Sequence, residues 1–475
     1  MHVLAWADDT VVFSLSEAGL RRSIDKTVSY YQDLGLSVNV KKTKVMVFNK
    51  RGLGPRYFSQ LKFFAGGLQL EIAEQYTYLG VVFIPSGAVY EATNTLATKC
   101  SRAWFSLSNF LYENKRMSVE KYQKLIDTLV LPVGLYSSEL LAPLSLPAKS
   151  FLSTDNLLQA WEGFYLEIVN QRACRLLLSV QKKTSRLAVL GELGRYPVFI
   201  KSIVQSIMYE HCILKYQPKA LVGQAIAEMQ VLNDSNSWQG RVRSMKTLLE
   251  ISEYPENWSE KRVSKNITNK IQSKFEIFFK DEINKEKVGA GDGTDHNKLR
   301  FYKTFKGCFK PEYYISNINN RNQRAWLSRL RTSSHRLEVE RGRYTGVPFN
   351  QRLCKYCPQE ASGMVDTETH FLLECAAFSN QRRCFLARIA SLVPNFGNLS
   401  KEDKVKILLC PASNIAAKTV NKFIGLMFKA REKIDEGADP AQLTFPPQVI
   451  LQDIDESDVD SDVEGEYDSA SGSEE

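Results

Sequence analysis

The feature that most constrains the fold of this chain is a group of three cysteines and one histidine. Cys354, Cys357, His370 and Cys375 follow one another in the spacing C-x₂-C-x₁₂-H-x₄-C. Three thiolates and one imidazole at such spacings are suitable donors for a tetrahedral zinc ion, and four protein donors leave no position open for catalysis. The sequence therefore predicts a structural Zn²⁺ site that brings four separated residues to one point.

Two alternatives stay open for this motif. Cys384 lies nine residues after Cys375 and could replace it as the fourth donor, or the four residues could be unliganded side chains of a helical domain. Five further cysteines have no partner at ligand spacing: Cys100, Cys174, Cys212, Cys308 and Cys410. We expect these five to be buried, reduced thiols.

A basic segment directly precedes the cysteine motif. It holds eight arginines and two interleaved aromatic residues: Arg321, Arg324, Trp326, Arg329, Arg331, Arg336, Arg341, Arg343, Tyr344 and Arg352. Guanidinium groups suit phosphates, and aromatic rings stack on unpaired bases. The segment therefore predicts a nucleic-acid clamp beside the zinc site. The alternative is a solvated helix face balanced by Glu338 and Glu340, with Trp326 in the core; His335, which has no companion ligand, is predicted to be a structural histidine.

The amino-terminal segment places Asp8 and Asp9 between two apolar runs, VLAW and TVVF. Runs rich in β-branched and aromatic residues on either side of a turn-forming pair predict a β-hairpin. An ordinary Asp-rich turn without a cation is the plain alternative.

The next segment, SLSEAGLRRSIDKTVSYYQDLGL, repeats apolar residues every three or four positions, which predicts a helix that stops at Gly35. Strands are predicted in LSVNVKKTKVMVFNK and YTYLGVVFI.

This order of elements resembles the palm of a reverse transcriptase of the non-LTR retrotransposon (LINE) class. WADD stands where that family has an aromatic residue followed by Ala-Asp-Asp, although Trp6 replaces the usual Tyr or Phe. The next family motif falls on Gly35, Leu36, Asn39, Lys42 and Thr43. YTYLGVVF is similar to the strand that follows, and LPVGLYSSELLAP, RACRLLLSVQKKTSRLAVLGELGRYPV and RLRTSSHRLEVERGRY resemble the long carboxyl-terminal region, which in this family includes a Cys-Cys-His-Cys motif.

The resemblance implies RNA-directed DNA synthesis by two-metal phosphoryl transfer. In an intact palm, Asp8 and Asp9 would help to bind Mg²⁺, and Lys42 would lie near the incoming triphosphate. A solvated lysine in a basic turn is the alternative for Lys42. Because the family's other catalytic Asp and its fingers lie upstream of this box, we expect a carboxyl-terminal piece that is inactive alone. A repurposed, non-catalytic RNA- or DNA-binding protein is the second hypothesis, so enzyme activity stays open.

The predicted fold is α+β and mostly helical, with six segments. These are a partial palm (1–88), a helical thumb-like domain (89–251), a polar linker (252–298), an arginine-rich zinc-knuckle module (299–392), a helical extension (393–440) and a disordered acidic tail (441–475). No apolar run reaches the roughly 20 residues of a membrane span, and no signal peptide is visible. We expect no membrane partner, no small-molecule substrate and a cytoplasmic or nuclear location rather than secretion.

The net charge of +9 hides an uneven distribution of charge along the chain. From Leu451 onward there are 11 acidic residues and no Lys or Arg, which leaves a charge of +20 on the first 450 residues. Such a basic body favours a polyanionic partner, for which RNA and DNA are the commonest cases. A basic protein without such a partner is the alternative.

Removal of the acidic tail tests whether it competes with nucleic acid for the basic body. We predict that residues 1–450 bind single-stranded RNA more tightly than the full chain at low salt, because a tethered polyanion competes at high effective concentration. Fluorescence anisotropy across a salt series measures both affinities. Equal affinities at low salt would show that the tail does not compete with RNA for the basic body.

Overall fold

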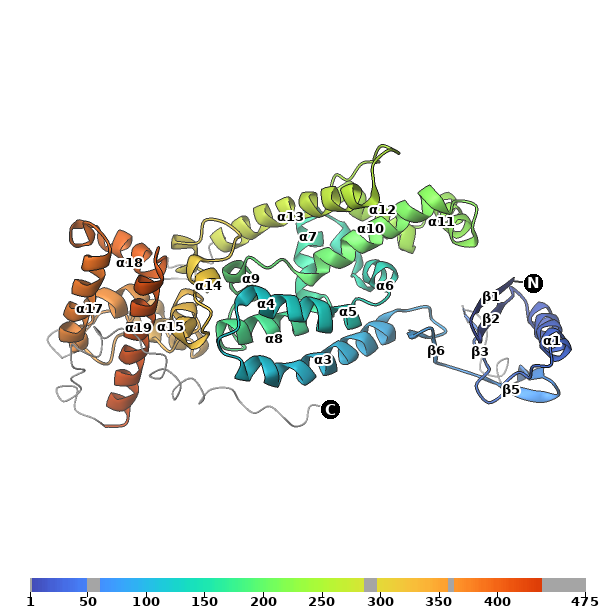
Figure 1. Cartoon of the computed structure of the whole chain (residues 1–475), viewed down its shortest axis with the longest axis horizontal. Coiled ribbons are helices and arrows are strands. Elements are labelled where there is room, and N and C mark those ends of the chain that lie inside the picture. The colour runs from blue at the N-terminus through green and yellow to red at the C-terminus, as the bar shows by residue number, and fades with distance from the viewer. Residues whose placement is uncertain (1, 49–59, 286–296, 358–362, 438–475) are drawn as a thin grey trace.

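The computed structural model describes residues 2–48, 60–285, 297–357 and 363–437. The described chain is mostly helical with small sheets, which confirms the predicted α+β class in which helices predominate. A small amino-terminal lobe lies at one end of the molecule, and the helices of the carboxyl-terminal part lie at the other (Figure 1). The predicted acidic tail, 441–475, lies outside the described residues.

The amino-terminal lobe begins with the predicted hairpin. Strands β1 (His2–Trp6) and β2 (Asp9–Phe13) pair antiparallel, and Trp6 lies opposite Asp9. The turn between them is formed by Ala7, with a φ of 53°, and Asp8. The hairpin prediction is therefore confirmed, with one carboxylate in the turn and the next at the start of β2.

Helix α1 (Glu17–Asp33) follows the hairpin and ends just before Gly35, as predicted. Three of its predicted apolar residues, Leu20, Ile24 and Val28, pack against a small separate core. That core is built on a sheet with the strand order β3–β5–β4. The strands are β3 (Lys44–Val45), β4 (Phe63–Ala65) and β5 (Leu68–Ile72).

The two strands predicted after α1 need correction. Of the described residues of LSVNVKKTKVMVFNK, only Lys44–Val45 form a strand, β3. The carbonyl of Asn39 accepts hydrogen bonds from the backbone N–H groups of Lys42 and Thr43 and closes a turn before it. YTYLGVVFI forms a hairpin instead of one strand, β6 (Tyr76–Tyr78) and β7 (Val81–Phe83). Leu79 and Gly80 both have positive φ, which suits a tight turn between antiparallel strands.

The middle of the chain is helical, as predicted for residues 89–216. Its helices are α3 (Tyr90–Glu113), α4 (Val119–Leu125), the π-helical η1 (Ile126–Val130), α5 (Leu131–Gly134), α6 (Ser138–Ser145), η2 (Ala148–Phe151), α7 (Thr154–Gln159), η3 (Ala160–Gly163), α8 (Glu167–Leu178), α9 (Arg186–Leu193), α10 (Val198–Tyr216), α11 (Leu221–Leu232) and α12 (Trp238–Leu248). Most buried side chains of these helices belong to one core that continues into the carboxyl-terminal part, whereas Ala92, Leu96 and Leu141 form a small separate cluster with Val82 of β7.

The predicted linker at 252–298 is wrong over most of its length. Residues Glu260–Asn284 form α13, one of the longest helices of the structure, which runs along the body beside α10 (Figure 1). Its apolar face recurs every three or four residues and is fully buried in the main core, for example at Ile267, Ile271 and Phe275. The glycine-bearing residues 286–296 lie outside the described residues.

The carboxyl-terminal part adds the helices that surround the cysteine motif. They are η4 (Tyr302–Thr304), α14 (Tyr313–Asn317), α15 (Asn322–Arg331), α16 (Glu338–Tyr344), η5 (Phe349–Gln351), η7 (His370–Glu374), η8 (Ala376–Phe378), α17 (Ser379–Leu392), η9 (Phe396–Asn398), α18 (Lys401–Leu409) and α19 (Asn414–Asp435). Helices α15 and α19 pack closely because Gly425 leaves room for Trp326: a Cβ at Gly425 would lie 2.7 Å from the indole ring. Trp326 also stacks on Phe428 at a centroid distance of 5.4 Å.

A buried ion pair joins α9 to α15 in the middle of this core. Both side chains of Glu192 and Arg331 are fully inaccessible, and their two hydrogen bonds measure 2.9 and 2.8 Å. Arg331 also contacts Glu312 at 3.0 Å and donates to the carbonyl of Leu409 at 2.6 Å. Burial alone would raise the pKa of Glu192, but Arg331 outweighs burial and lowers it.

No single described helix is long and apolar enough to cross a membrane. One pair of helical segments, Val119–Gly134 and Ser138–Ser145, is long and apolar enough for a membrane span only when the two are counted together. The pair is bent by 74° at the break between them. Buried residues of this pair, such as Val130, Leu131 and Ala142, belong to the main core.

Substitution of the buried carboxylate tests the central ion pair. We predict that Glu192→Gln lowers the free energy of unfolding by about 3–5 kcal/mol, because it removes the bidentate partner of a buried guanidinium and leaves it only Glu312, which is partly exposed. Because the pKa of Glu192 is lowered on folding, its contribution is complete at neutral pH and declines as the pH falls below about 4.

Chemical denaturation of the variants at pH 7 measures this effect. The matched control is Glu250→Gln, whose carboxylate pairs with Lys274 at 3.0 Å but is 78% exposed, and which should cost about 0–1 kcal/mol. Equal losses for the two substitutions would contradict a central role for the buried pair.

Candidate metal centre

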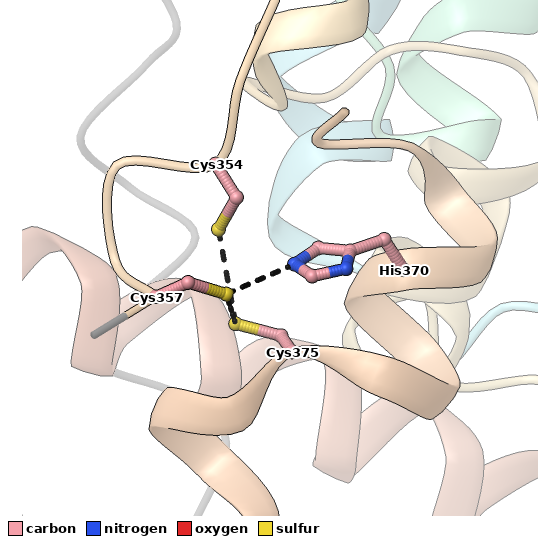
Figure 2. Close-up of side chains that lie close together, drawn as sticks. All are labelled: Cys354, Cys357, His370 and Cys375. Atoms are coloured by element: carbon pink, nitrogen blue, oxygen red, sulfur yellow. Dashed lines mark hydrogen bonds between the residues drawn. The ribbon is translucent and has the colours of Figure 1, made fainter. Parts of the chain in front are cut away.

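The four predicted zinc ligands converge in the carboxyl-terminal part. Cys354 and Cys357 lie on the loop after η5, His370 is the first residue of η7, and Cys375 follows the last residue of η7 (Figure 2). Their sulfur and nitrogen atoms all lie within 4.8 Å of one another. Among the described residues, this is the one group of three or more His, Cys, Asp or Glu side chains close enough together to bind a metal ion.

The spacing of the donor atoms fits a tetrahedral zinc ion. Cys375 Sγ lies 3.8 Å from both Cys354 Sγ and Cys357 Sγ, and Cys357 Sγ lies 3.4 Å from His370 Nε2. A zinc–sulfur bond of about 2.3 Å places two thiolates about 3.8 Å apart at the corners of a tetrahedron. The site could therefore bind a metal, and its donors and distances are compatible with structural zinc.

Local backbone structure brings the two halves of the motif together. Leu353 and Val365 form an antiparallel bridge, and the N–H of Cys354 donates to the carbonyl of Met364 at 2.9 Å. At η7 the N–H of Cys375 donates to the carbonyl of His370, five residues earlier, at 2.8 Å. This π-helical turn is wider than an α-turn and lets residues five positions apart face the same point.

A second layer of buried side chains anchors the ligands to α17 and α19. Arg431 of α19 forms two hydrogen bonds with Asp366, at 3.0 and 2.9 Å, and its guanidinium lies 3.8 Å from Cys354 Sγ. Arg382 of α17 donates to the carbonyl of Cys375 at 2.8 Å. Such outer contacts orient metal ligands and tune their basicity.

Burial and mutual hydrogen bonds shift the pKa values of the thiols in the site. A hydrogen bond that the Cys354 thiol donates to Cys375, together with burial, raises the pKa of Cys354 to about 12, and the same hydrogen bond lowers the pKa of Cys375, which accepts it. Coordination to a divalent cation favours the thiolate form, so metal binding at these residues would release protons. The buried Nδ1 of His370 has no hydrogen-bond partner, and Glu374 Oε2 lies 3.8 Å from it, near enough to become one.

The remaining cysteines lie outside the candidate metal centre. Cys384 is half-buried on α17 and is not part of the donor group, so Cys375 rather than Cys384 completes the set. The expectation that the other five are buried holds for Cys100 and Cys174 but is wrong for Cys308 and Cys410. These two are exposed because they lie in a loop and at the end of α18; Cys212 is half-buried.

Most of the predicted arginine clamp is wrong, because its guanidinium groups are buried and bonded to the protein itself. Arg321 donates to the carbonyl of Tyr112, Arg324 to that of Leu177, and Arg329 to that of Ser179. Arg331 forms the central ion pair, and Arg352 donates to the carbonyl of Val339. Trp326 is partly buried and packs against the core, which favours the alternative for that residue. These arginines build the fold and are not available to phosphates.

Four predicted nucleic-acid residues are at or near the surface. Arg336 and Arg341 are exposed and pair with Glu432 and Glu338, and Arg343, which is less exposed, pairs with Glu340. Tyr344, at the end of α16, is 60% exposed. His335 is buried and lies 3.2 Å from Glu368, which confirms the prediction of a structural histidine.

The palm-like residues lie far along the chain from the metal centre, in the amino-terminal lobe. Asp8 and Asp9 are both exposed, at the tip of the hairpin and the start of β2. Lys42 is exposed, and its backbone N–H donates hydrogen bonds to both the carbonyl oxygen and the side-chain oxygen of Asn39. Within the described chain, no group of three or more metal-binding donors includes either Asp.

Sequence reasoning missed the residues that support the ligands. Asp366 lies inside the motif but reads as an ordinary spacer residue, and Arg382 and Arg431 lie on later helices. No local pattern marks them, because their partners are distant in sequence.

Comparison with known protein families, with curated proteins and with solved structures finds no match to this chain.

The metal content of the full chain tests the candidate centre. We predict one zinc per chain by elemental analysis, and we expect Cys357→Ser to weaken zinc binding by more than about a hundredfold, since even outer-layer changes cost 10–100-fold. Cys384→Ser is the matched control and should retain the metal. Zinc-free protein at full folding, or equal zinc loss in both variants, would contradict the assignment.

Proposed function

We propose that this chain is a nucleic-acid-binding protein of reverse-transcriptase type, corresponding to the carboxyl-terminal part of a non-LTR retrotransposon enzyme. The observation that carries the proposal is the hairpin tip with Asp8 and Asp9, followed in order by α1, the Asn39–Thr43 turn and the β6–β7 hairpin. In a polymerase palm, adjacent carboxylates at a rigid turn between strands bind divalent cations. The exposure of both carboxylates supports such a role.

The proposed catalytic contribution is partial. Two-metal phosphoryl transfer needs carboxylates that hold both ions about 3.5–4 Å apart. The described residues supply the adjacent pair Asp8 and Asp9, but they bring no third donor to it. We infer that polymerisation needs ligands from outside these residues, with Lys42 as the candidate cation for a triphosphate.

The proposed role of the zinc is structural. Three thiols and one imidazole fill a tetrahedral shell and leave no position for water or substrate. Arg431 and Arg382 tie the same residues to α19 and α17, so a bound zinc would fix how these helices pack. The ion would thereby stabilise the surface of the basic body without taking part in a reaction.

The proposed partners are RNA and DNA. A charge of +20 over the first 450 residues supports a polyanionic ligand. The absence of disulfides among the nine cysteines, all of which are described, supports a reducing compartment, nuclear or cytoplasmic.

A second candidate function is a non-catalytic nucleic-acid-binding protein that no longer needs the palm. The separate cores favour it: the amino-terminal lobe packs around Val45, Phe63 and Leu70, whereas the helical body has its own continuous core. The body can therefore keep its structure independently of the carboxylates at the hairpin.

Primer extension tests whether the chain has polymerase activity by itself. We predict that the full chain binds a primed RNA template but does not extend the primer with Mg²⁺ or Mn²⁺, because the metal-binding carboxylates are incomplete. The assay compares the wild type with Asp8→Asn and with Asp25→Asn, an exposed residue of α1 in the same lobe. Extension that is lost only in Asp8→Asn would overturn the prediction, and failure to bind the template would overturn the proposed partner.

A further inference from the structure

An exposed tyrosine and two lysines from three distant segments meet on one surface of the helical body. Tyr344 lies at the end of α16, Lys183 in the loop between α8 and α9, and Lys298 just before η4. Lys183 Nζ lies 5.0 Å from the centroid of the Tyr344 ring, and Lys298 Nζ lies 5.9 Å from it. The ammonium of Lys183 therefore lies near the ring, and that of Lys298 lies at the hydroxyl end of the same side chain.

Hydrogen bonds hold this arrangement in place. Lys298 Nζ donates to the carbonyl of Lys183 at 2.6 Å and to the hydroxyl of Tyr344 at 3.2 Å. The loop between α15 and α16 also bonds to the segments that carry the two lysines. The hydroxyl of Ser334 accepts a hydrogen bond from the N–H of Gln181 at 2.9 Å, and the hydroxyl of Ser333 donates to the carbonyl of Lys298 at 3.3 Å. The surface is thus pre-organised, which lowers the entropic cost of binding a ligand.

The charge of this surface is not balanced within the described chain. The nearby carboxylates of α16 are already engaged: Glu340 pairs with Arg300 and Arg343, and Glu338 pairs with Arg341. Among the described residues, neither Lys183 nor Lys298 forms an ion pair. Two unneutralised ammonium groups beside one tyrosine repel each other, and an anion bound between them would remove that repulsion.

We propose that Tyr344, Lys183 and Lys298 form a binding platform for single-stranded nucleic acid, an inference that rests on the nucleic-acid-binding function proposed above. The exposed ring stacks on an unpaired base, and the two ammonium groups bind the adjoining phosphates. Proteins that bind single strands combine aromatic faces with cations in this way. A duplex offers phosphates but no free base face, so the platform favours single strands over duplexes.

Binding of a labelled single-stranded RNA to the full chain, measured by fluorescence anisotropy, tests the stacking role. Tyr344→Ala should weaken binding at least about fivefold, because stacking on an aromatic ring is worth about 1–3 kcal/mol per base. Tyr344→Phe keeps the ring and should bind nearly as the wild type. The matched control is Tyr216→Ala, which removes a tyrosine of similar exposure with a single lysine, Lys215, 5.3 Å from its ring.

The salt dependence tests the lysines separately. Lys183→Gln should reduce the slope of log K against log salt by about 0.7, the value for one phosphate contact on a single strand. Lys149→Gln is the control: it removes an exposed lysine of η2 that is not part of the platform and should leave the slope unchanged. Thermal melting of each variant verifies that folding is retained.

The outcomes separate the two proposals. Absence of any RNA binding by the wild type would contradict the proposed function and the platform with it. Normal binding by the chain and by Tyr344→Ala would overturn the platform alone. An equal loss of affinity for a duplex of the same sequence in Tyr344→Ala would refute recognition of an unpaired base, whereas a loss confined to the single strand supports it.

Discussion

The buried ion pair between Glu192 and Arg331 is the interaction on which the arrangement of the helical body depends. Removing two charges from water is costly, so the pair persists only because both partners are fully hydrogen-bonded. Arg331 satisfies this condition by also donating to the carbonyl of Leu409. One side chain thus fixes α9, α15 and the end of α18 relative to one another, with a directionality that apolar packing lacks.

The position of the metal centre follows from this constraint through a chain of contacts. Helix α15 carries Trp326, which lies against Gly425 and thereby sets how closely α19 approaches. Helix α19 carries Arg431, which binds Asp366 and approaches the sulfur of Cys354. Two sets of contacts therefore position the four residues: the hydrogen bonds of their own loop and π-turn, and the guanidinium of Arg431 on α19.

Several local patterns were read correctly from the sequence, although the strands after Gly35 and the helix in the predicted linker were not, and long-range pairing was missed. The hairpin at Asp8 and the ligand set that ends at Cys375 depend on spacing alone, so the sequence contained the information needed to predict them. The arginine clamp failed because the partner that buries Arg331 lies 139 residues away in the sequence. The linker prediction gave the polar composition of 252–298 more weight than the helical spacing of Ile267, Ile271 and Phe275, although that spacing was visible.

The dependence of the ligands on Arg431 also sets an order of events during synthesis of the chain. Arg431 follows Cys354 by 77 residues, so all four donors leave the ribosome well before the guanidinium that supports them. The nascent motif can meet a metal ion while its outer layer is still missing and its thiols are open to solvent. Packing of α19 then adds Arg431 to these residues, so the last helix of the described chain supplies the final outer contacts of the site.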